Sequence, residues 1–273
     1  MKILLTGATG FLGRNISEHF SDLDITPLNS KSLNLTNQAE VNSFFKGSGG
    51  FDTVIHCAIK GGKRTDVESM QTYFDNVDMA LNIMDNKKYF NNLINFCSGA
   101  AYSRKFDILN SPESIIKYKY PTDFYGMAKG AIAKQVNRRG YYNLRIFACF
   151  NNNEPDSRFI KTCIRNIKNK EPIEIQEDKY FDFFYAKDVN IVIEKILKDD
   201  PLPHKDINLS YNNKLKLSEL AIIISKKMGV KPNVVIFNEQ GLNYTGAPDR
   251  LYELGLPLTG LDKALDEYIA NEH

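Results

Sequence analysis

The 273-residue sequence has no tryptophan, only four cysteines and almost no net charge. Its 35 lysines and arginines against 33 aspartates and glutamates leave a formal charge of +2, whereas nucleic-acid binding through bulk charge needs a basic patch or stripe. No apolar run approaches the roughly 18 residues that cross a bilayer. The first seven residues lead straight into a glycine loop and do not resemble a signal peptide. We therefore expect a cytoplasmic protein with no membrane or nucleic-acid partner.

The cysteines are widely spaced and none belongs to a CxxC pair. They are Cys57, Cys97, Cys149 and Cys163, mostly in apolar segments. This pattern argues against a disulfide framework and against a metal site, so we expect free thiols in a reducing compartment and no bound metal.

Short apolar runs alternate with longer amphipathic stretches along the first half of the chain, the pattern of β-α-β units that build a parallel sheet. The runs predict strands at 2–5, 25–28, 53–56, 93–97 and 143–147. The stretches between them predict helices at 10–20, 38–45, 67–84 and 123–138. Because such connections are right-handed, the fold class is predicted to be α/β, a Rossmann-type doubly wound parallel sheet with helices on both faces.

The regular alternation ends near residue 150, where an asparagine-rich loop begins. The second half predicts helices at 158–168, 189–198, 217–228 and 261–271. We therefore expect a dinucleotide-binding domain over residues 1–150. Residues 151–273 are expected to form mainly a smaller α/β substrate-binding lobe, with some segments returning to the Rossmann sheet.

A glycine loop joins the first strand to the first helix. It reads Thr6-Gly7-Ala8-Thr9-Gly10-Phe11-Leu12-Gly13. Gly7 allows a tight turn, Gly10 lets the backbone approach a diphosphate, and Gly13 lets the helix pack closely on the strand. The helix N-terminus favours an anion. A tight structural turn would explain the glycines alone, but the flanking strand and helix favour dinucleotide binding by Gly7, Thr9, Gly10, Phe11, Leu12 and Gly13.

The end of the second strand bears on which dinucleotide binds. An NAD enzyme usually has a carboxylate there for the ribose hydroxyls, whereas a 2′-phosphate prefers cationic and hydroxyl partners. Here the strand is followed by Asn29, Ser30 and Lys31. This favours NADP(H), with NAD(H) possible, although Lys31 could equally be a solvated loop residue.

Tyr125 and Lys129 lie four residues apart at the start of a predicted helix and therefore on one face. A nearby ammonium favours the phenolate and brings a phenol into the working range of an acid-base catalyst. Upstream, Ser98 ends a strand at the sheet edge where doubly wound folds bind ligands. An amphipathic pair and a strand-end cap are the plain alternatives. The three residues occur together and in this order after the glycine loop, which favours catalysis by Ser98, Tyr125 and Lys129.

With these motifs, the chain resembles an extended short-chain dehydrogenase/reductase of the nucleotide-sugar epimerase, dehydratase and reductase type. The likeness includes the Ser98-to-Tyr102 interval and the segments 144–147, 183–189 and 251–257. Segments 33–36 and 58–62 are most similar to GDP-L-fucose synthase-like 4-ketoreductases. Cys57, Ala58 and Ile59 end the third predicted strand and are expected to line the cofactor cleft by position, with plain core packing as the alternative. Asn34, Leu35, Tyr125 and Lys129 are also expected to bind the cofactor. The resemblance also implies a homodimer.

Departures from the family pattern indicate the reaction. Gly99 and Ala100 follow Ser98 where dehydratases carry Asp-Glu. Ala100 also occupies the position of the epimerising Cys, and Arg158 that of the epimerising His. An alanine methyl cannot move a proton and an arginine stays charged. Ser98, Ala100, Tyr125 and Arg158 are thus expected to contact the substrate.

The resemblance then implies NADPH-dependent reduction of the C4 ketone of a nucleotide-diphosphate 4-keto sugar. A GDP-linked 6-deoxyhexose or heptose is favoured, without C3 or C5 epimerisation, in the supply of sugars for surface polysaccharide. A C4 epimerase that retains its NAD, or a dinucleotide-binding regulator without catalysis, remains the alternative. Among the other polar residues, His56 is expected to be a satisfied strand-end histidine, and Asn76 and Asn82 are expected to be solvated helix residues.

Overall fold

The computed structural model describes residues 1–62 and 67–272. They form two compact units, each built from several stretches of chain. Unit 1 comprises Met1–Ser103, Glu113–Arg145 and Ile193–Ile207, and unit 2 comprises Arg104–Pro112, Ile146–Val192 and Asn208–His273. Unit 2 thus includes a segment from the first half of the chain, Arg104–Pro112, and unit 1 includes one from the second half, Ile193–Ile207. The division of cofactor and substrate binding near residue 150 stays a prediction.

The centre of unit 1 is a six-stranded parallel sheet of order β10-β6-β4-β3-β1-β2. Its strands are β1 (Lys2–Thr6), β2 (Asp24–Leu28), β3 (Phe51–His56), β4 (Phe90–Ser98), β6 (Tyr142–Ile146) and β10 (Asp206–Leu209). β1 lies in register with both neighbours, so that Leu4 is opposite Thr26 of β2 and Val54 of β3. The predicted doubly wound sheet is confirmed, and β10 adds an edge strand from the second half of the chain.

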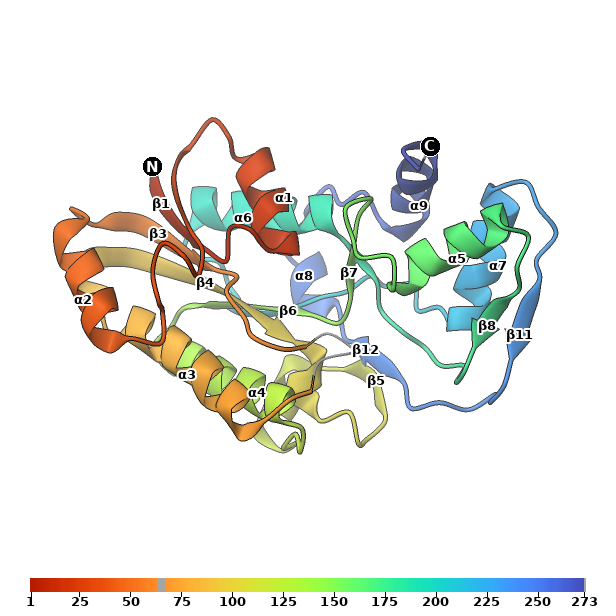
Figure 1. Cartoon of the computed structure of the whole chain (residues 1–273), viewed down its shortest axis with the longest axis horizontal. Coiled ribbons are helices and arrows are strands. Elements are labelled where there is room, and N and C mark those ends of the chain that lie inside the picture. Colours follow the sequence, from red (N-terminus) through yellow and green to blue (C-terminus); the bar gives the residue numbers. More distant parts are fainter. Residues whose placement is uncertain (63–66, 273) are drawn as a thin grey trace. The chain divides into compact units, whose positions relative to one another are not determined.

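Helices cover both faces of this sheet (Figure 1). They are α1 (Phe11–His19), α2 (Gln38–Gly47), α3 (Met70–Met84), α4 (Phe124–Arg138) and α6 (Ala186–Asp199). α2, α3 and α4 pack on one face through a shared apolar core. On the other face α1 and α6 lie side by side, joined by the 2.5 Å contact between His19 Nε2 and Glu194 Oε1.

The core between the sheet and α3 is a cluster of buried apolar side chains. Leu4 and Val54 of the sheet belong to one buried apolar cluster with Met79 and Ile83 of α3. Fully burying each such side chain contributes roughly 1.5–3 kcal/mol. α3 begins at Met70, three residues later than predicted, because Ser69 and Thr72 form a capping box there.

Three short 3₁₀ helices complete unit 1: η1 (Lys87–Tyr89), η2 (Gly99–Tyr102) and η3 (Glu113–Lys117). Of these, η2 directly follows β4 and packs against α4. The chain therefore turns sharply at the end of β4, beside the start of the helix that carries Tyr125.

Unit 2 combines short strand pairs with helices. Its strands pair as β11 with β8, β12 with β5, and β7 with β9. Its elements are β5 (Ile108–Ser111), β7 (Cys149–Phe150), α5 (Phe159–Lys168), β8 (Ile173–Ile175), β9 (Phe184–Tyr185), α7 (Leu217–Lys227), β11 (Val234–Ile236), β12 (Tyr244–Gly246), α8 (Asp249–Tyr252) and α9 (Leu261–Ala270). Apart from β5, these strands have only two or three residues, too few to show a period of two, and the sequence does not predict them.

Over the described ranges 1–62 and 67–272, no helix has the length and apolar character needed to cross a membrane.

Candidate active site

The turn after β1 has the shape that the glycine loop predicts. Gly7 has a left-handed backbone, with φ of +68°, and a Cβ there would lie 2.6 Å from the amide nitrogen of Ala58. A Cβ on Gly13 would lie 2.1 Å from the carbonyl oxygen of Gly7. Neither position tolerates a side chain, because the turn is pressed between the segment after β3 and the first turn of α1.

Gly10 differs from the other two glycines. It is the N-cap of α1, and its φ of −76° is open to any residue. Thr9 and Gly10 are exposed, and the first turn of α1 contains no acidic residue. The backbone N–H groups at this helix start can therefore receive an anion, which fits the diphosphate role predicted for residues 9–13.

The carboxyl ends of β1 and β3 adjoin each other in the sheet. Such an edge, where successive connections diverge, is where doubly wound folds bind ligands. The N–H of Cys57 donates to the carbonyl of Thr6 at 3.2 Å, and the N–H of Ala58 donates to Thr6 Oγ1 at 3.4 Å. Cys57 and Ala58 are half-buried and Ile59 is exposed. These three predicted cofactor residues thus lie beside the glycine loop.

Two titratable groups at this edge are held neutral. His56 is buried and its Nδ1 pairs with Thr6 Oγ1 at 2.8 Å. Burial, with the nearby charge of Lys129, lowers the pKa of His56 to about 3. Burial also raises the pKa of the Cys57 thiol well above its ordinary value. Neither group gains or loses a proton near neutral pH, and neither can serve as an acid-base catalyst there. His56 is therefore the satisfied strand-end histidine that the sequence predicted.

The loop after β2 presents exposed polar side chains. Asn29 Oδ1 accepts from the backbone N–H groups of Lys31 and Ser32, which shapes a tight turn. Ser30 and Lys31 are exposed, and among the described residues the Lys31 ammonium has no hydrogen-bond or ion-pair partner. Both side chains can therefore reach a ligand at the end of β2.

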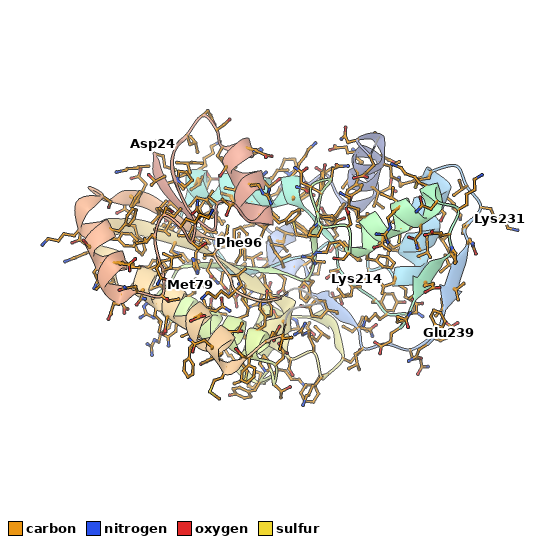
Figure 2. All side chains as sticks on the ribbon, viewed as in Figure 1. Asp24, Met79, Phe96, Lys214, Lys231 and Glu239 are labelled. Atoms are coloured by element: carbon orange, nitrogen blue, oxygen red, sulfur yellow. The ribbon has the colours of Figure 1, made fainter. Side chains whose placement is uncertain are left out.

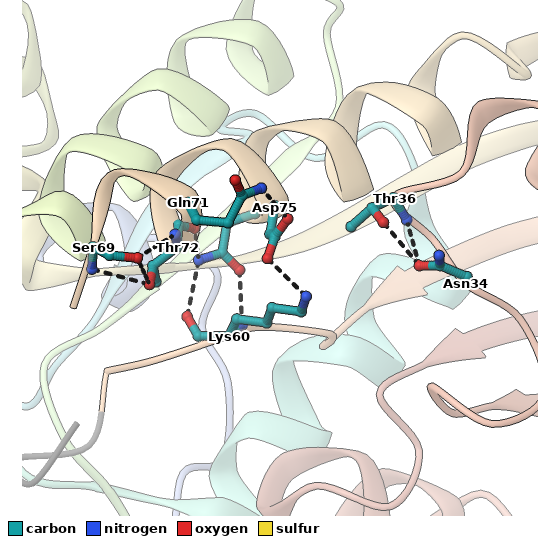
Figure 3. Close-up of polar contacts among 8 residues, drawn as sticks. Asn34, Thr36, Lys60, Ser69, Gln71, Thr72 and Asp75 are labelled. Atoms are coloured by element: carbon teal, nitrogen blue, oxygen red, sulfur yellow. Dashed lines mark hydrogen bonds and ion pairs between the residues drawn. The ribbon is translucent and has the colours of Figure 1, made fainter. Parts of the chain in front are cut away.

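The next part of this loop is more firmly held. Asn34 Oδ1 accepts from both the N–H and the hydroxyl of Thr36 (Figure 3). Leu35 is buried, and its carbonyl accepts from Asn82 Nδ2 at 2.9 Å. Asn34 remains exposed, whereas the Leu35 side chain belongs to the core.

Tyr125 lies in the first turn of α4, where two carboxylates satisfy free backbone N–H groups. Asp123 Oδ1 accepts from the N–H of Gly126 at 2.8 Å. Glu68 Oε2, from the segment before α3, accepts from the N–H of Tyr125 itself at 3.0 Å. The backbone of Tyr125 is thus anchored from its own helix start and from a second segment.

Lys129 follows one turn later and is only 7% exposed. Its Nζ donates to the carbonyl of Phe96 on β4 at 2.6 Å and lies 5.9 Å from the centroid of the Tyr125 ring. Phe96 is buried on β4, within unit 1 (Figure 2). Burial lowers the pKa of Lys129 below its ordinary value. The structure thereby places this ammonium between β4 and the phenol.

Ser98 ends β4 and caps η2, where its Oγ accepts from the N–H of Ala100 at 3.2 Å. η2 packs against the first turn of α4, since a Cβ on Gly126 would lie 2.8 Å from the Ala100 carbonyl oxygen. Ser98 and Ala100 are therefore beside the helix turn that carries Tyr125. Both are buried, at 8% and 1% exposure.

Two asparagines of α3 were wrongly expected to be solvated. Asn76 and Asn82 are 1% and 7% exposed and bond the backbones of two separate loops, at Lys60 and at Leu35. A signal was present in the sequence: Asn76 is spaced with Met79, Ala80 and the residues beyond as one helical face. Asparagine on an otherwise apolar face indicates a buried amide with backbone partners.

Arg158, the remaining predicted substrate residue, belongs to unit 2. It is exposed at the N-cap of α5. The asparagine-rich loop before it is tied to α9, because Asn152 Nδ2 donates to the carbonyl of Tyr268 at 2.8 Å. In the same loop the buried Glu154 accepts a 3.1 Å hydrogen bond from the Tyr268 hydroxyl.

Burial raises the pKa of Glu154 to about 7, against the opposing effects of the Tyr268 hydrogen bond and of Arg158 and Lys161. The folded chain keeps this proton up to about pH 7, whereas the unfolded chain loses it near the ordinary glutamate pKa of 4.5. The folded state binds more protons in this window, so stability falls as pH rises from 4.5 to 7 and not further above it. We expect Glu154→Gln to abolish that fall and to stabilise the protein by up to about 3 kcal/mol near pH 8.

Urea unfolding at about pH 5 and pH 8 measures this effect. The exposed Glu171 of the same unit provides the control, since Glu171→Gln should leave both values unchanged. Equal pH dependence in the parent and in Glu154→Gln would contradict the prediction.

The model of the NAD dependent epimerase/dehydratase family matches residues 3–210. The chain belongs to this family. It is 27% identical over 262 residues to GDP-L-colitose synthase from Yersinia pseudotuberculosis, covering 86% of this chain and 84% of that protein. The predicted extended short-chain dehydrogenase/reductase class, and with it an enzyme that uses a nicotinamide dinucleotide, is confirmed.

Solved structures agree on the fold. GDP-mannoheptose C4 reductase from Campylobacter jejuni, solved with NADP bound, superposes with a TM-score of 0.82 at 16% identity and covers 98% of this chain and 97% of its own. UDP-glucose 4-epimerase from Thermus thermophilus, in complex with NAD, gives 0.79 at 16% identity, covering 99% and 98%. One architecture therefore serves both a reductase and an epimerase, and the fold alone does not choose between them.

Proposed function

We propose that this protein reduces the C4 ketone of a nucleotide-diphosphate 4-keto sugar with NADPH, without epimerising C3 or C5. A GDP-linked 6-deoxyhexose or heptose is the preferred substrate, for sugars of surface polysaccharide made in the cytosol. The observation that carries the proposal is Tyr125 with the buried Lys129 on α4, beside Ser98 at the end of β4.

The shape of the glycine loop favours binding of the dinucleotide. The absence of side chains at Gly7 and Gly13 brings the loop backbone and the start of α1 together, and Thr9 to Gly13 would receive the diphosphate. Ser30 and Lys31 would receive a 2′-phosphate, since both are exposed and no carboxylate ends β2. When bound, the reduced nicotinamide supplies the hydride that the ketone carbon gains.

The chain's own residues handle the proton. Tyr125 donates its hydroxyl proton to the developing alkoxide, and Ser98 donates a hydrogen bond to the same oxygen. The Lys129 ammonium stabilises the phenolate that remains, at 5.9 Å from the ring centroid, and would also bond the nicotinamide ribose. The Phe96 carbonyl fixes the direction of this ammonium.

Positions 100 and 158, which carry the epimerising groups in GDP-L-fucose synthase, hold no pair suited to carbon-acid chemistry in this chain. The buried Ala100 has only a methyl group, and Arg158 remains cationic. We propose that Arg158 instead binds a substrate phosphate or sugar hydroxyl.

We also propose a homodimer, formed where Met70 and Phe74 of α3 and Met127 of α4 are exposed. Light scattering of the purified protein measures its mass.

NADPH oxidation in the presence of freshly made 4-keto nucleotide sugars tests the function. We expect net oxidation, faster with NADPH than with NADH, and a product reduced at C4 with no solvent deuterium at C3 or C5. Tightly retained NAD with redox-neutral turnover would instead identify a C4 epimerase. Dinucleotide binding without any turnover across the panel would indicate the non-catalytic regulator and would refute the proposal.

A further inference from the structure

The segment after β3 leaves no room for a side chain beside the Tyr125 ring. Gly62 has a left-handed backbone, with φ of +86°. A Cβ on Gly62 would lie 2.6 Å from Cε2, 2.9 Å from Cζ and 3.1 Å from Cδ2 of Tyr125. These are the ring atoms on one edge, up to the carbon that carries the hydroxyl. The backbone of Gly62 therefore limits where this edge of the phenol can lie.

A buried asparagine fixes the backbone just before Gly62. Asn76 Oδ1 accepts from the N–H of Lys60 at 2.8 Å, and Asn76 Nδ2 donates to the carbonyl of Lys60 at 2.9 Å. The same amide nitrogen also donates to the carbonyl of Thr72, one turn earlier in α3. Both polar groups of the Lys60 backbone are thus bonded to one side chain that is 1% exposed.

The Lys60 side chain is also bonded to α3 (Figure 3). Lys60 Nζ pairs with Asp75 at 2.7 Å, and Asp75 also accepts from Gln71. Because Lys60 is more than half exposed, this pair adds little to stability. Its effect is to hold the Lys60 side chain along α3, next to the backbone bonds that Asn76 makes.

We propose that Asn76 and Gly62 are positioning residues for the catalytic phenol, a role that rests on the proposed function. Asn76 fixes the Lys60 backbone to α3, and Gly62, two residues later, sets the place of the Tyr125 ring relative to Lys129. The glycine is needed for two reasons, since both its left-handed backbone and its missing side chain are required at this contact.

Gly62→Ala tests the contact directly. A methyl at 2.6 Å must move the ring by about 1 Å to reach an ordinary contact of about 3.5 Å. A displacement of that size lowers kcat by up to about 100-fold while the KM for NADPH changes by less than about threefold. The pH profile of kcat shifts as well, because the distance from phenol to ammonium changes.

Gly49→Ala is the matched control. Gly49 has a similar left-handed φ of +72°, but a Cβ there meets no atom within 4 Å. It therefore carries the backbone strain without the ring contact, and its kcat and pH profile should be those of the parent.

Asn76→Ala tests the anchor and does not depend on the folding of the glycine variant. We expect kcat to fall about tenfold. Its control, Asn82→Ala, removes a buried amide from the same helix that bonds the Leu35 loop, so it should affect the KM for NADPH more than kcat. Comparable melting temperatures for the two variants would separate positioning from general loss of stability.

Two results would overturn this proposal: a Gly62→Ala enzyme with the kcat and pH profile of Gly49→Ala, or equal losses of kcat in Asn76→Ala and Asn82→Ala. Tyr125→Phe distinguishes an error in the proposed function from an error in the positioning role. If that variant keeps the parent kcat, the proposed function is wrong. If it is inactive while Gly62→Ala behaves like its control, only the positioning role is wrong.

Discussion

Replacing Tyr125 by phenylalanine is expected to lower the kcat of ketone reduction by roughly 10²–10⁴-fold, the usual contribution of a positioned general acid. The substitution removes only the hydroxyl. The ring keeps its contact with Gly62 and the backbone keeps its hydrogen bond to Glu68, so the start of α4 should not move. Dinucleotide affinity, measured by fluorescence titration, should stay within about threefold of the parent.

Tyr120 provides the control for this variant. It lies five residues earlier, is 64% exposed and contacts Lys134 through its ring. Tyr120→Phe should therefore retain the parent kcat. Unchanged turnover in Tyr125→Phe, or an equal loss in both variants, would show that the phenol of Tyr125 is not the proton donor.

The second large effect concerns stability. Replacing Arg145 by methionine is expected to lower the free energy of unfolding by about 3–5 kcal/mol, because the substitution leaves the largely buried carboxylate of Asp206 without its cation. Arg145 is fully buried on β6, and its Nη2 pairs with Asp206 Oδ1 at 3.0 Å. Its Nη1 donates to the Tyr102 hydroxyl at 2.7 Å, and the guanidinium lies 4.6 Å from the centroid of the Tyr102 ring.

The cluster of Arg145, Asp206 and Tyr102 also links the sheet to η2, which adjoins Ser98 of the candidate active site. Tyr102 ends η2, whose first turn Ser98 caps, so Arg145 joins η2 to β6 and β10. Asp206 retains hydrogen bonds from Asn143 and Asn137 after the substitution, which keeps the loss below that of a fully isolated charge. We expect the weakened η2 to reduce kcat as well.

Urea unfolding of Arg145→Met measures the change, with Arg139→Met as the control. Arg139 is partly exposed and pairs with Asp85 at 3.4 Å, a surface contact that contributes at most about 1 kcal/mol. If the two variants lose the same stability, the buried cluster does not have the structural importance argued above. Replacing Arg145 and Asp206 together should recover part of the loss, since no unpaired charge then remains.

Much of unit 1 follows from local rules. A short strand, a glycine turn and a helix start are specified by neighbouring residues. The sequence therefore predicted the loop over 7–13 and the strands β1, β2, β3, β4 and β6 to within a few residues. The four-residue spacing of Tyr125 and Lys129 is likewise a local property of a helix. Ser98 was predicted from its place at a strand end, and the structure puts it beside α4.

Other features depend on contacts between distant segments. β10 has four residues and no distinctive pattern, and it becomes a sheet strand only because β6 offers an open edge. Asn76 was wrongly expected to be solvated, since its role depends on the Lys60 backbone 16 residues earlier. Glu154 keeps its proton because α9, more than a hundred residues later, buries it against Tyr268.

The sequence alone therefore determined the class of protein and the turn of the glycine loop, and it predicted the catalytic set, because backbone turns and helical spacing are set by adjacent residues. Only the tertiary structure decided which polar groups are buried and which backbone lies against the phenol. Burial and close approach depend on where remote segments of the chain meet. The contact of Gly62 with Tyr125 is such a case, since 63 residues separate a glycine from the ring whose position it limits.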